Sequence, residues 1–509
     1  IDKAVVKALF SIQNWFLENV GNIDLATIEN WFSYNPKQPL LFNSALFLGL
    51  FLIFYVIYIL SRKTHYFRIT YVVLFSLFFY YKSSGVYFWI LIFSSVVDYS
   101  LSRLIYVEAK QFYRKFYLIL SLVINLGMLG YFKYTNFFID NYNSLFDGNM
   151  KFEDIILPVG ISFYTFQTLS YTIDVYRREL EPTKSFMDFL FFVSFFPQLV
   201  AGPIVRASDF IPQIYEKLRL TKEDFNRALF LIIGGLIKKA VISDYISSNF
   251  VDRVFDAPNS YTAFENLMAS YGYAIQIYCD FSGYSDIAIG LALLMGFWLP
   301  DNFRTPYQSG SITEFWRRWH ISLSSWLRDY LYISLGGNRK GKIRTYFNLF
   351  MTMLLGGLWH GASWKFVVWG VLHGLALVVE KFFGQFIKLP KNVFVRTIQV
   401  ILTFHFVVFC WLFFRAKDFA TAFQIADNIT KLTFDLNQWQ TIILGYKNVF
   451  LLITIGVVWH FVPVKTLAGM QKTFSTLPLV AKAVLLGLIY WVVYATASAD
   501  TQPFIYFQF

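Results

Sequence analysis

The sequence predicts an all-α polytopic membrane protein, and three observations support this fold class. Of the 509 residues, 56% are hydrophobic and only 15% are charged, whereas soluble domains carry roughly 25% charged residues. Apolar segments follow one another along the chain without a soluble block between them. Pairs of basic residues occupy the short segments between the apolar ones. A water-soluble chain of this size cannot bury so much apolar surface in one core. A lipid bilayer accommodates that surface, because apolar side chains can face the lipid.

The first forty residues are more polar than the rest. Apolar residues alternate with polar ones at roughly helical spacing at Val5, Val6, Leu9, Phe10 and residues 12–16. This pattern indicates one or two amphipathic helices at the membrane interface, closed by Pro36 and Pro39. Ile1 is not followed by a basic region and a short apolar stretch, so we expect no removable signal peptide. We divide the chain into an amphipathic extension, residues 1–40, and a membrane domain, residues 41–509.

Thirteen apolar runs are candidates for membrane spans: residues 40–60, 69–82, 86–104, 115–134, 154–172, 186–204, 226–249, 264–298, 346–358, 364–384, 394–414, 446–463 and 478–497. A helix needs about 20 apolar residues to span a bilayer. Several runs are shorter, and some contain Pro or Gly, as at Pro197 and Gly202–Pro203. Broken helices survive in membranes only inside protein or along a cavity. We therefore expect about eleven full spans and some re-entrant pieces.

The net charge of +12 has a topological interpretation. Basic pairs occur between apolar runs, at Arg62–Lys63, Arg114–Lys115, Arg177–Arg178, Lys238–Lys239 and Arg339–Lys340. Short cytoplasmic loops carry such residues, so this pattern favours membrane orientation over nucleic-acid binding. The longest polar stretch, residues 299–345, is expected on the cytoplasmic side for the same reason.

His360 is the first candidate catalytic residue. It stands in Gly356–Gly–Leu–Trp–His–Gly–Ala–Ser–Trp364, between two apolar runs. An ionisable residue at membrane depth is costly and marks a functional site by default. A neutral imidazole acts as a general base on a hydroxyl, and flanking glycines would let a substrate approach it. The alternative is a histidine that packs helices together. Trp359, its neighbour, is a candidate substrate-binding residue.

His320 is the second candidate, in Trp316–Arg–Arg–Trp–His320. If this stretch is one helix, a mostly apolar stripe contains Thr313, Trp316, His320, Leu323 and Leu327. His320 would then face protein or lipid, while Arg317 and Arg318 could meet phosphates; with Trp316 they are candidate substrate-binding residues. The alternative is a surface helix with Trp anchors and snorkelling basic residues.

Two acids, Asp280 and Asp286, interrupt an apolar run. They are not on one helical face, but Gln276, Asp280 and Tyr284 are. Asp280 is a candidate substrate-binding residue, and a polar cluster that ties helices together is the alternative. No histidine stands at ligand spacing and no HExxH motif occurs, so we predict no metal site.

Residues 336–343 nearly match a phosphate-binding loop. Ile343 replaces the Ser or Thr that would hold magnesium, which argues against a nucleotide hydrolase. The basic groups of this loop, with Asn338, could still contact phosphates of an acyl donor. Of the other histidines, His65, His405 and His460 are expected at the interface, and His373 in helix packing. The two cysteines, Cys279 and Cys410, make neither a disulfide scaffold nor a metal motif.

Taken in order, these motifs resemble the membrane-bound O-acyltransferase family. The resemblance begins near Leu41–Ser44, continues through residues 158–164 and 196–203, and is most specific across residues 278–364. It is closest to the bacterial branch of membrane subunits for alginate and peptidoglycan O-acetylation. It implies a ring of transmembrane helices around a thinned centre, with a funnel from each side.

The resemblance also implies roles for individual residues. His360 matches the family's catalytic histidine and His320 its second functional histidine. The ending Phe504–Ile–Tyr–Phe507 is similar to that of the branch, in which Tyr506 would carry the acyl group; a phenol deprotonated by a histidine is a competent nucleophile. Acetyl-CoA or another cytosolic thioester is implied as donor, with no bound cofactor. A separate extracytoplasmic acetyltransferase protein is implied as partner.

We therefore predict a membrane O-acetyltransferase of the bacterial inner membrane that serves an exported or envelope polysaccharide. One alternative is a transporter, but we see none of the internal symmetry that transporters often show. Another is a scaffold subunit of a polysaccharide secretion system, which would not need His360 between glycines at membrane depth.

Overall fold

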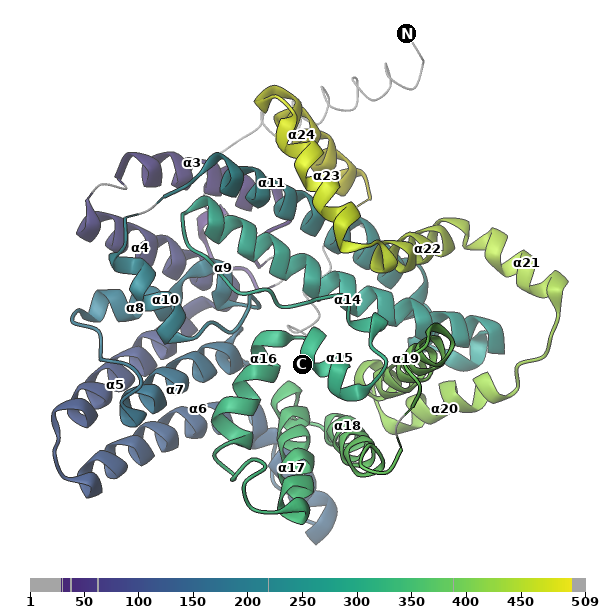
Figure 1. The fold of residues 1–509 in the computed structure, drawn as a ribbon, viewed down its shortest axis with the longest axis horizontal. Helices are drawn as coiled ribbons and strands as arrows, with labels where there is room; N and C mark the ends of the chain where they lie inside the picture. Colours follow the sequence, from purple (N-terminus) through teal and green to yellow (C-terminus); the bar gives the residue numbers. More distant parts are fainter. Residues whose placement is uncertain are drawn as a thin grey trace.

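In the computed structural model, residues 29–496 are described, except residues 30, 37–38, 62–63, 218 and 388. Only the backbone is described for residues 494–496. Most of the predicted amphipathic extension, the basic pair Arg62–Lys63 and Tyr506 lie outside the described residues. The described part is helical and contains no strand, as Figure 1 shows. The predicted all-α class is confirmed.

The helices pack into one body (Figure 1). Their bounds are α3 (Ala45–Ser61), α4 (His65–Ser84), η1 (Gly85–Tyr87), α5 (Phe88–Val107), α6 (Gln111–Phe146), α7 (Ile161–Arg177), α8 (Phe186–Ser194), α9 (Phe196–Leu199), α10 (Ala207–Tyr215), α11 (Lys222–Leu236), η2 (Ile237–Ser243), α12 (Asp244–Ile246), η3 (Ser247–Val251), α13 (Asp252–Asp256), η4 (Pro258–Ser260), α14 (Ala263–Leu294), η5 (Pro306–Gln308), α15 (Ile312–Arg318), α16 (Ile321–Trp326), η6 (Leu327–Tyr332), α17 (Lys342–His360), α18 (Trp364–Phe383), α19 (Val393–Arg415), α20 (Phe419–Thr430), α21 (Leu436–Gly445), α22 (Lys447–Phe461), α23 (Val464–Thr476) and α24 (Leu479–Thr496). Three of the η segments, namely η2, η3 and η6, are π-helical.

Fewer of the described helices are long and apolar enough to span a membrane than the sequence predicts. By length and composition, the described residues contain five candidate spans, or up to seven if each of two bent pairs counts as one. The bends measure 91° between α21 and α22 and 117° between α23 and α24. The expectation of eleven spans is wrong because apolar runs also form internal helices. The run at 154–172 becomes α7, which is buried along nearly its whole length. The run at 186–204 breaks into α8 and α9.

Helix α14 forms the centre of the molecule (Figure 1), and 94% of its most apolar stretch is buried. Its closest neighbour is α11, and glycines allow the approach. A Cβ on Gly235 would lie 2.6 Å from the carbonyl oxygen of Gly283, and a Cβ on Gly283 would lie 2.8 Å from that of Gly235. Small residues at a helix crossing let two backbones pack closely inside a membrane.

Buried ion pairs also join α14 to the chain that follows α11. Lys239 of η2 lies 2.6 Å from Asp280 and 2.7 Å from Asp244, and Lys238 lies 2.6 Å from Asp286. The sequence prediction that Lys238–Lys239 is a loop pair is therefore wrong, since both lysines lie in a π-helix. Their charges hold helices together, as the polar-cluster alternative for this region described.

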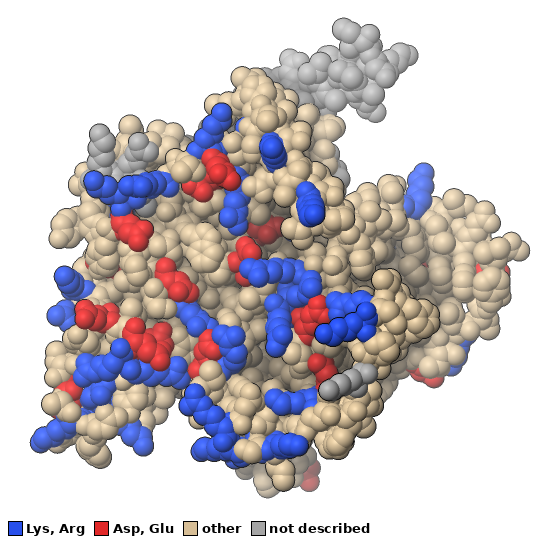
Figure 2. Space-filling view, viewed as in Figure 1, with Lys and Arg blue, Asp and Glu red and all other residues tan. Residues whose placement is uncertain are grey.

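The polar stretch 299–345 is a folded layer rather than one helix. It contains η5, α15, α16 and η6 and then a turn that leads into α17. Its anchor is Glu380 near the end of α18, whose carboxylate accepts the backbone N–H groups of Ile312 and Thr313 at 2.8 and 3.1 Å. Figure 2 shows basic side chains gathered on the face that presents α15, α16 and the start of α17. We call this the basic face.

Candidate functional site

His360 is the last residue of α17 and is only 3% exposed. Its imidazole lies edge-to-face against three rings, those of Trp359, Trp369 and Phe414, at centroid distances of 5.1, 5.0 and 5.3 Å. These rings come from α17, α18 and α19. The imidazole is therefore fixed in an aromatic cage and shielded from water.

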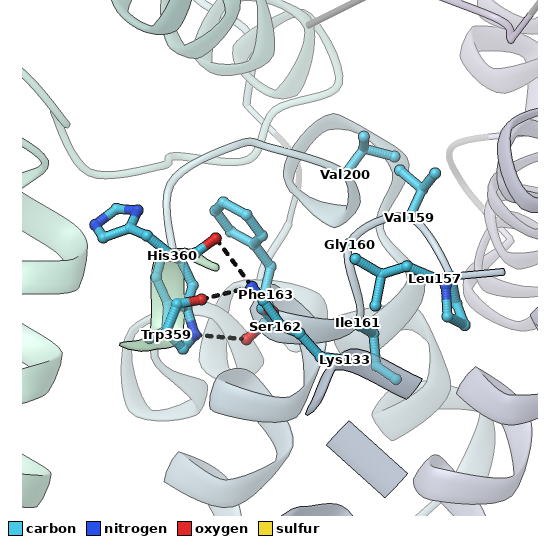
Figure 3. Close-up of a pocket in the computed structure, with 11 residues that line it drawn as sticks. Lys133, Leu157, Val159, Gly160, Ile161, Ser162, Phe163, Val200, Trp359 and His360 are labelled. Carbon is cyan, nitrogen blue, oxygen red and sulfur yellow. Dashed lines mark hydrogen bonds between the residues drawn. The ribbon is translucent and has the colours of Figure 1, made fainter. Parts of the chain in front are cut away.

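A small cavity adjoins this cage. It measures about 60 Å³ and is lined by Lys133, residues 157–163, Val200, Trp359 and His360. Figure 3 shows the loop 157–161 on one side of the cavity and the end of α17 on the other. The same figure shows the carbonyl of His360 directed toward the ammonium of Lys133, while the imidazole points the opposite way.

The glycines around His360 serve helix packing. A Cβ on Gly357 would lie 2.3 Å from the carbonyl oxygen of Phe366 and 2.9 Å from the Cα of Gly370, both on α18. A Cβ on Gly361 would lie 2.1 Å from the ring of Phe366. The sequence interpretation assigned these glycines to substrate approach. In the structure they allow α18 to pack tightly against the helix that carries His360.

His320 lies where the predicted helix breaks. Helix α15 ends at Arg318, and His320 adopts a left-handed conformation with φ of 43° before α16 begins. The continuous stripe expected from Thr313 to Leu327 is therefore wrong. Of the two surroundings expected for His320, protein or lipid, the structure shows protein, since its side chain is fully buried.

Hydrogen bonds fix the tautomer of His320. The Oδ1 atom of Asn302 accepts the backbone N–H of Ser322 at 3.2 Å, and it lies 3.2 Å from Nδ1 of His320. An amide oxygen in this position accepts, so Nδ1 carries the proton and Nε2 carries a lone pair. Among the described residues, Nε2 has no hydrogen-bond partner. His320 thus presents an unused acceptor inside the protein.

The two histidines belong to one cluster of rings. The ring of Trp359 lies 6.2 Å from that of His320 and 5.1 Å from that of His360. On the other side, the ring of Trp369 lies 5.0 Å from His360 and 4.8 Å from His373. The structure therefore brings together both histidines that the sequence selected and the tryptophan beside them.

The sequence interpretation assigned His373 to helix packing, and the structure places its ring one tryptophan away from that of His360. His373 is fully buried, and its Nδ1 accepts the indole N–H of Trp316 at 3.3 Å. Trp316 therefore joins the cluster through His373. The sequence linked His373 only to Trp369, since these residues are four apart and share a face of one apolar helix. The contact of Trp369 with His360 forms only when α18 packs against α17. Lys133 likewise had no sequence signal that linked it to His360.

The arginine pair beside His320 lies on the basic face, but its two members differ. Arg318 lies 2.8 Å from Glu314, which also binds Arg396 at 2.7 Å. These guanidinium groups, with the hydrogen bond from Arg396 as the largest cause, lower the pKa of Glu314 to about 2. Arg317 is exposed and pairs with no acid among the described residues. Arg317 is the one available to a phosphate.

The remaining predicted site residues lie elsewhere. Asp280 is held by Lys239 in the centre of the fold. Asn338 is exposed in the turn before α17 and accepts from Lys381 at 3.2 Å, at the end of α18 opposite the His360 cage. Tyr506 lies outside the described residues. His460 is buried rather than interfacial, and its Nε2 accepts the backbone N–H of Tyr307 at 2.9 Å.

No metal site or nucleotide loop is formed in the described part of the chain. No group of three or more His, Cys, Asp or Glu side chains there could hold a metal ion. The stretch 336–343 follows the π-helical η6 instead of a strand. Both Gly336 and Gly341 have positive φ angles, so this stretch is a tight turn.

Comparison with known proteins gives consistent matches. The model of the membrane-bound O-acyltransferase family matches residues 112–419, which include both histidines, His373 and Lys133. The chain is 44% identical over 336 residues to the probable alginate O-acetylase AlgI of Pseudomonas aeruginosa, covering 65% of this chain and 63% of that one. It is 38% identical over 423 residues to the peptidoglycan O-acetyltransferase of Helicobacter pylori, covering 77% and 80%. A teichoic acid D-alanyltransferase of Bacillus subtilis is 31% identical over 284 residues, covering 52% of this chain and 70% of that one.

Proposed function

The chain belongs to the membrane-bound O-acyltransferase family, and on this premise we propose that it transfers an acetyl group to an exported or cell-envelope polysaccharide. The names of its relatives support this substrate class, since two of them act on alginate and peptidoglycan. The observation that carries the proposal is the cage of His360. A buried imidazole at the end of α17, one ring away from a second histidine, suits proton transfer sheltered from water.

The proposed reaction is acyl transfer from a thioester to a hydroxyl. His360 takes the proton of the attacking hydroxyl while the hydroxyl oxygen forms a bond to the carbonyl carbon of the acetyl group. The carbon–sulfur bond then breaks, and the thiolate leaves and takes up the proton. The unused acceptor on Nε2 of His320 belongs to a ring 6.2 Å from that of Trp359. There it can orient the donor or receive a proton during the exchange.

We place the donor on the basic face and identify that face as cytoplasmic. Positive residues accumulate on the cytoplasmic side of membrane proteins, and Arg317 offers an unpaired guanidinium there. A donor with phosphate groups, such as acetyl-CoA, matches this charge. The acetyl group would leave on the opposite side, in the inner membrane of a bacterium. An extracytoplasmic acetyltransferase protein would complete its delivery to the polymer.

The test is His360→Ala in purified protein reconstituted in proteoliposomes. With labelled acetyl-CoA as donor, we expect loss of acetyl transfer and of thioester cleavage, because the variant lacks the proposed general base. The variant should remain folded, which its melting temperature in detergent would report. Near-normal turnover by a folded His360→Ala protein would overturn the proposal.

We further propose that Tyr506 supplies the attacking hydroxyl and then carries the acetyl group to the acceptor. Tyr506→Phe keeps the ring and removes only the phenolic oxygen, so a purely structural tyrosine would tolerate it at a cost of about 0.5–1.5 kcal/mol. If Tyr506 is the carrier, transfer to the polymer should stop. Mass spectrometry should then find an added acetyl group on the C-terminal peptide of the wild type and on neither Tyr506→Phe nor His360→Ala. Wild-type transfer by Tyr506→Phe would reject the carrier role.

A further inference from the structure

We propose that Lys133 and Tyr134 of α6 are positioning residues, which hold the end of α17 and thereby fix the imidazole of His360. The inference rests on the proposed function and adds two residues to its machinery. It is carried by the hydrogen bonds between two segments that are more than two hundred residues apart in the chain.

The end of α17 needs external donors. The last four carbonyl groups of an α-helix have no partner inside the helix. Helices often satisfy them with a glycine in a left-handed turn, but Gly361 is extended, with φ of −169°. Trp359 and His360 are at most 5% exposed, so water is a poor substitute. A buried carbonyl without a donor costs free energy.

Two consecutive residues of α6 supply the missing donors. The hydroxyl of Tyr134 donates to the carbonyl of Leu358 at 2.6 Å. The ammonium of Lys133 donates to the carbonyl of Trp359 at 2.6 Å and to that of His360 at 3.1 Å. Three of the four terminal carbonyls are thus bound by one neighbouring helix, and Figure 3 shows the two bonds from Lys133.

The ammonium of Lys133 is fully used by the protein. It has three N–H groups, and the third points to the hydroxyl of Ser162 at 3.3 Å. Lys133 therefore joins α6, the start of α7 and the end of α17. It also lies 5.9 Å from the centre of the Trp359 ring. Because no N–H remains for a substrate, its role is to position His360 rather than to act on the reacting atoms. A cation at a helix C-terminus also stabilises that end.

Holding the backbone here controls the imidazole. The carbonyl of His360 is bound on one side of the helix end, and the imidazole sits in its cage on the other (Figure 3). If the last turn of α17 frays or rotates, the ring leaves its position against Trp369 and Phe414. A displacement of about 1 Å in a catalytic group is enough to lower turnover roughly 100-fold.

The chain provides a matched control in Lys365. Its ammonium donates to the carbonyl of Ala416 at 2.9 Å, at the end of α19. Lys365 therefore binds a helix-terminal carbonyl in the same way as Lys133. The helix that it binds carries Phe414 of the cage but not His360 itself. A general effect of removing such a lysine would appear equally in both variants, whereas loss of the bonds to the His360 backbone occurs only in the Lys133 variant.

The experiment compares Lys133→Met, Lys133→Arg, Tyr134→Phe and Lys365→Met in the full chain, reconstituted in proteoliposomes with labelled acetyl-CoA. We expect Lys133→Met to lower kcat about 100-fold while the KM for the donor stays within about twofold of wild type. Lys133→Arg, which keeps the charge and the donors, should recover most of that loss. Tyr134→Phe should fall between them, and Lys365→Met, which leaves the end of α17 intact, should lose much less kcat than Lys133→Met.

Each outcome decides the inference. A Lys133→Met protein with the kcat of Lys365→Met overturns it, as does a loss in Lys133→Met that appears only in KM. If Lys133→Met does not accumulate in the membrane, the Tyr134→Phe variant decides whether the inference holds. Wild-type kcat in Tyr134→Phe overturns the inference. A reduced kcat at unchanged melting temperature supports it. Activity in His360→Ala would instead defeat the proposed function, so the two failures are distinguishable.

Discussion

The protein places lysines inside its membrane domain at two regions that satisfy the charge differently. Between η2 and α14, Lys238 and Lys239 pair with carboxylates. At the end of α17, Lys133 pairs with carbonyl oxygens and a hydroxyl. In the first region neither partner can be removed without leaving an opposite charge buried. In the second, removing the lysine leaves only neutral groups. We infer that the first region holds the fold and the second holds the site.

The largest expected effect comes from breaking the first region. Lys239→Met would leave Asp280 and Asp244 without their shared cation, at a cost of about 3–5 kcal/mol in folding free energy. We expect a lower melting temperature in detergent and a lower yield from membranes. Adding Asp280→Asn to Lys239→Met should restore part of the stability, because it removes one uncompensated charge. An unchanged melting temperature in Lys239→Met would remove the distinction between the two regions.

A second test addresses the cations of the basic face. Replacing Arg317 and Arg318 with Gln together should weaken donor use more than folding, since each charge-assisted bond to phosphate contributes about 1.5–3 kcal/mol. Single variants sharpen this result. Arg317→Gln should raise the KM for acetyl-CoA at constant melting temperature, whereas Arg318→Gln should also disturb the pairing with Glu314. A donor dependence that is unchanged in the double variant would show that these arginines serve orientation only.

A third test asks whether the glycines near His360 belong to the fold or to the site. Gly357→Ala introduces a Cβ 2.3 Å from a carbonyl oxygen of α18, and we expect a destabilisation of about 1–3 kcal/mol from overpacking. Gly127→Ala is the control, because no atom lies within 4 Å of a Cβ at that position. The control should be neutral or stabilising, since alanine favours a helix. If Gly357→Ala lost turnover without losing stability, the glycine would serve substrate access after all.

The smallest expected effect is a pH dependence on the basic face. The pKa of Glu314 is lowered to about 2 in the folded protein, chiefly by Arg396. Its stabilising contribution is therefore present above the ordinary glutamate pKa of about 4.3 and is lost as the pH falls toward about 2. Exposed pairs contribute only about 0–1 kcal/mol. The difference in melting temperature between wild type and Glu314→Gln should shrink from pH 6 to pH 3. A difference in melting temperature that stays constant from pH 6 to pH 3 would show that Glu314 contributes through packing and not through its charge.

Composition and periodicity predicted the helical membrane class, because a lipid solvent imposes the same apolar requirement on every exposed helix. They overestimated the number of spans, since an apolar run such as residues 154–172 looks alike whether it faces lipid or lies inside the protein as α7. The motifs identified His320 and His360, and the structure brings both rings close to that of Trp359. The break at His320 was missed because its left-handed conformation has no marker such as glycine.

Lys133 and His373 show why the rest was out of reach. In the sequence, Lys133 is one more basic residue within an apolar run. Only the packing of α6 against α17 brings its ammonium to the carbonyls at the end of α17. His373 reads as a packing residue until α18 is folded against α17. Contacts between distant segments decide both assignments, and a single sequence carries no direct record of such contacts.

The contact between α6 and the end of α17 also has a consequence for biogenesis. Lys133 and His360 are separated by 227 positions in the chain, and α6 is synthesised first. The carbonyls of α17 therefore find their donors only after the ribosome has made both helices and the bundle has closed around them. Until both helices have packed together, the end of α17 lacks the bonds that hold the backbone of His360 in place.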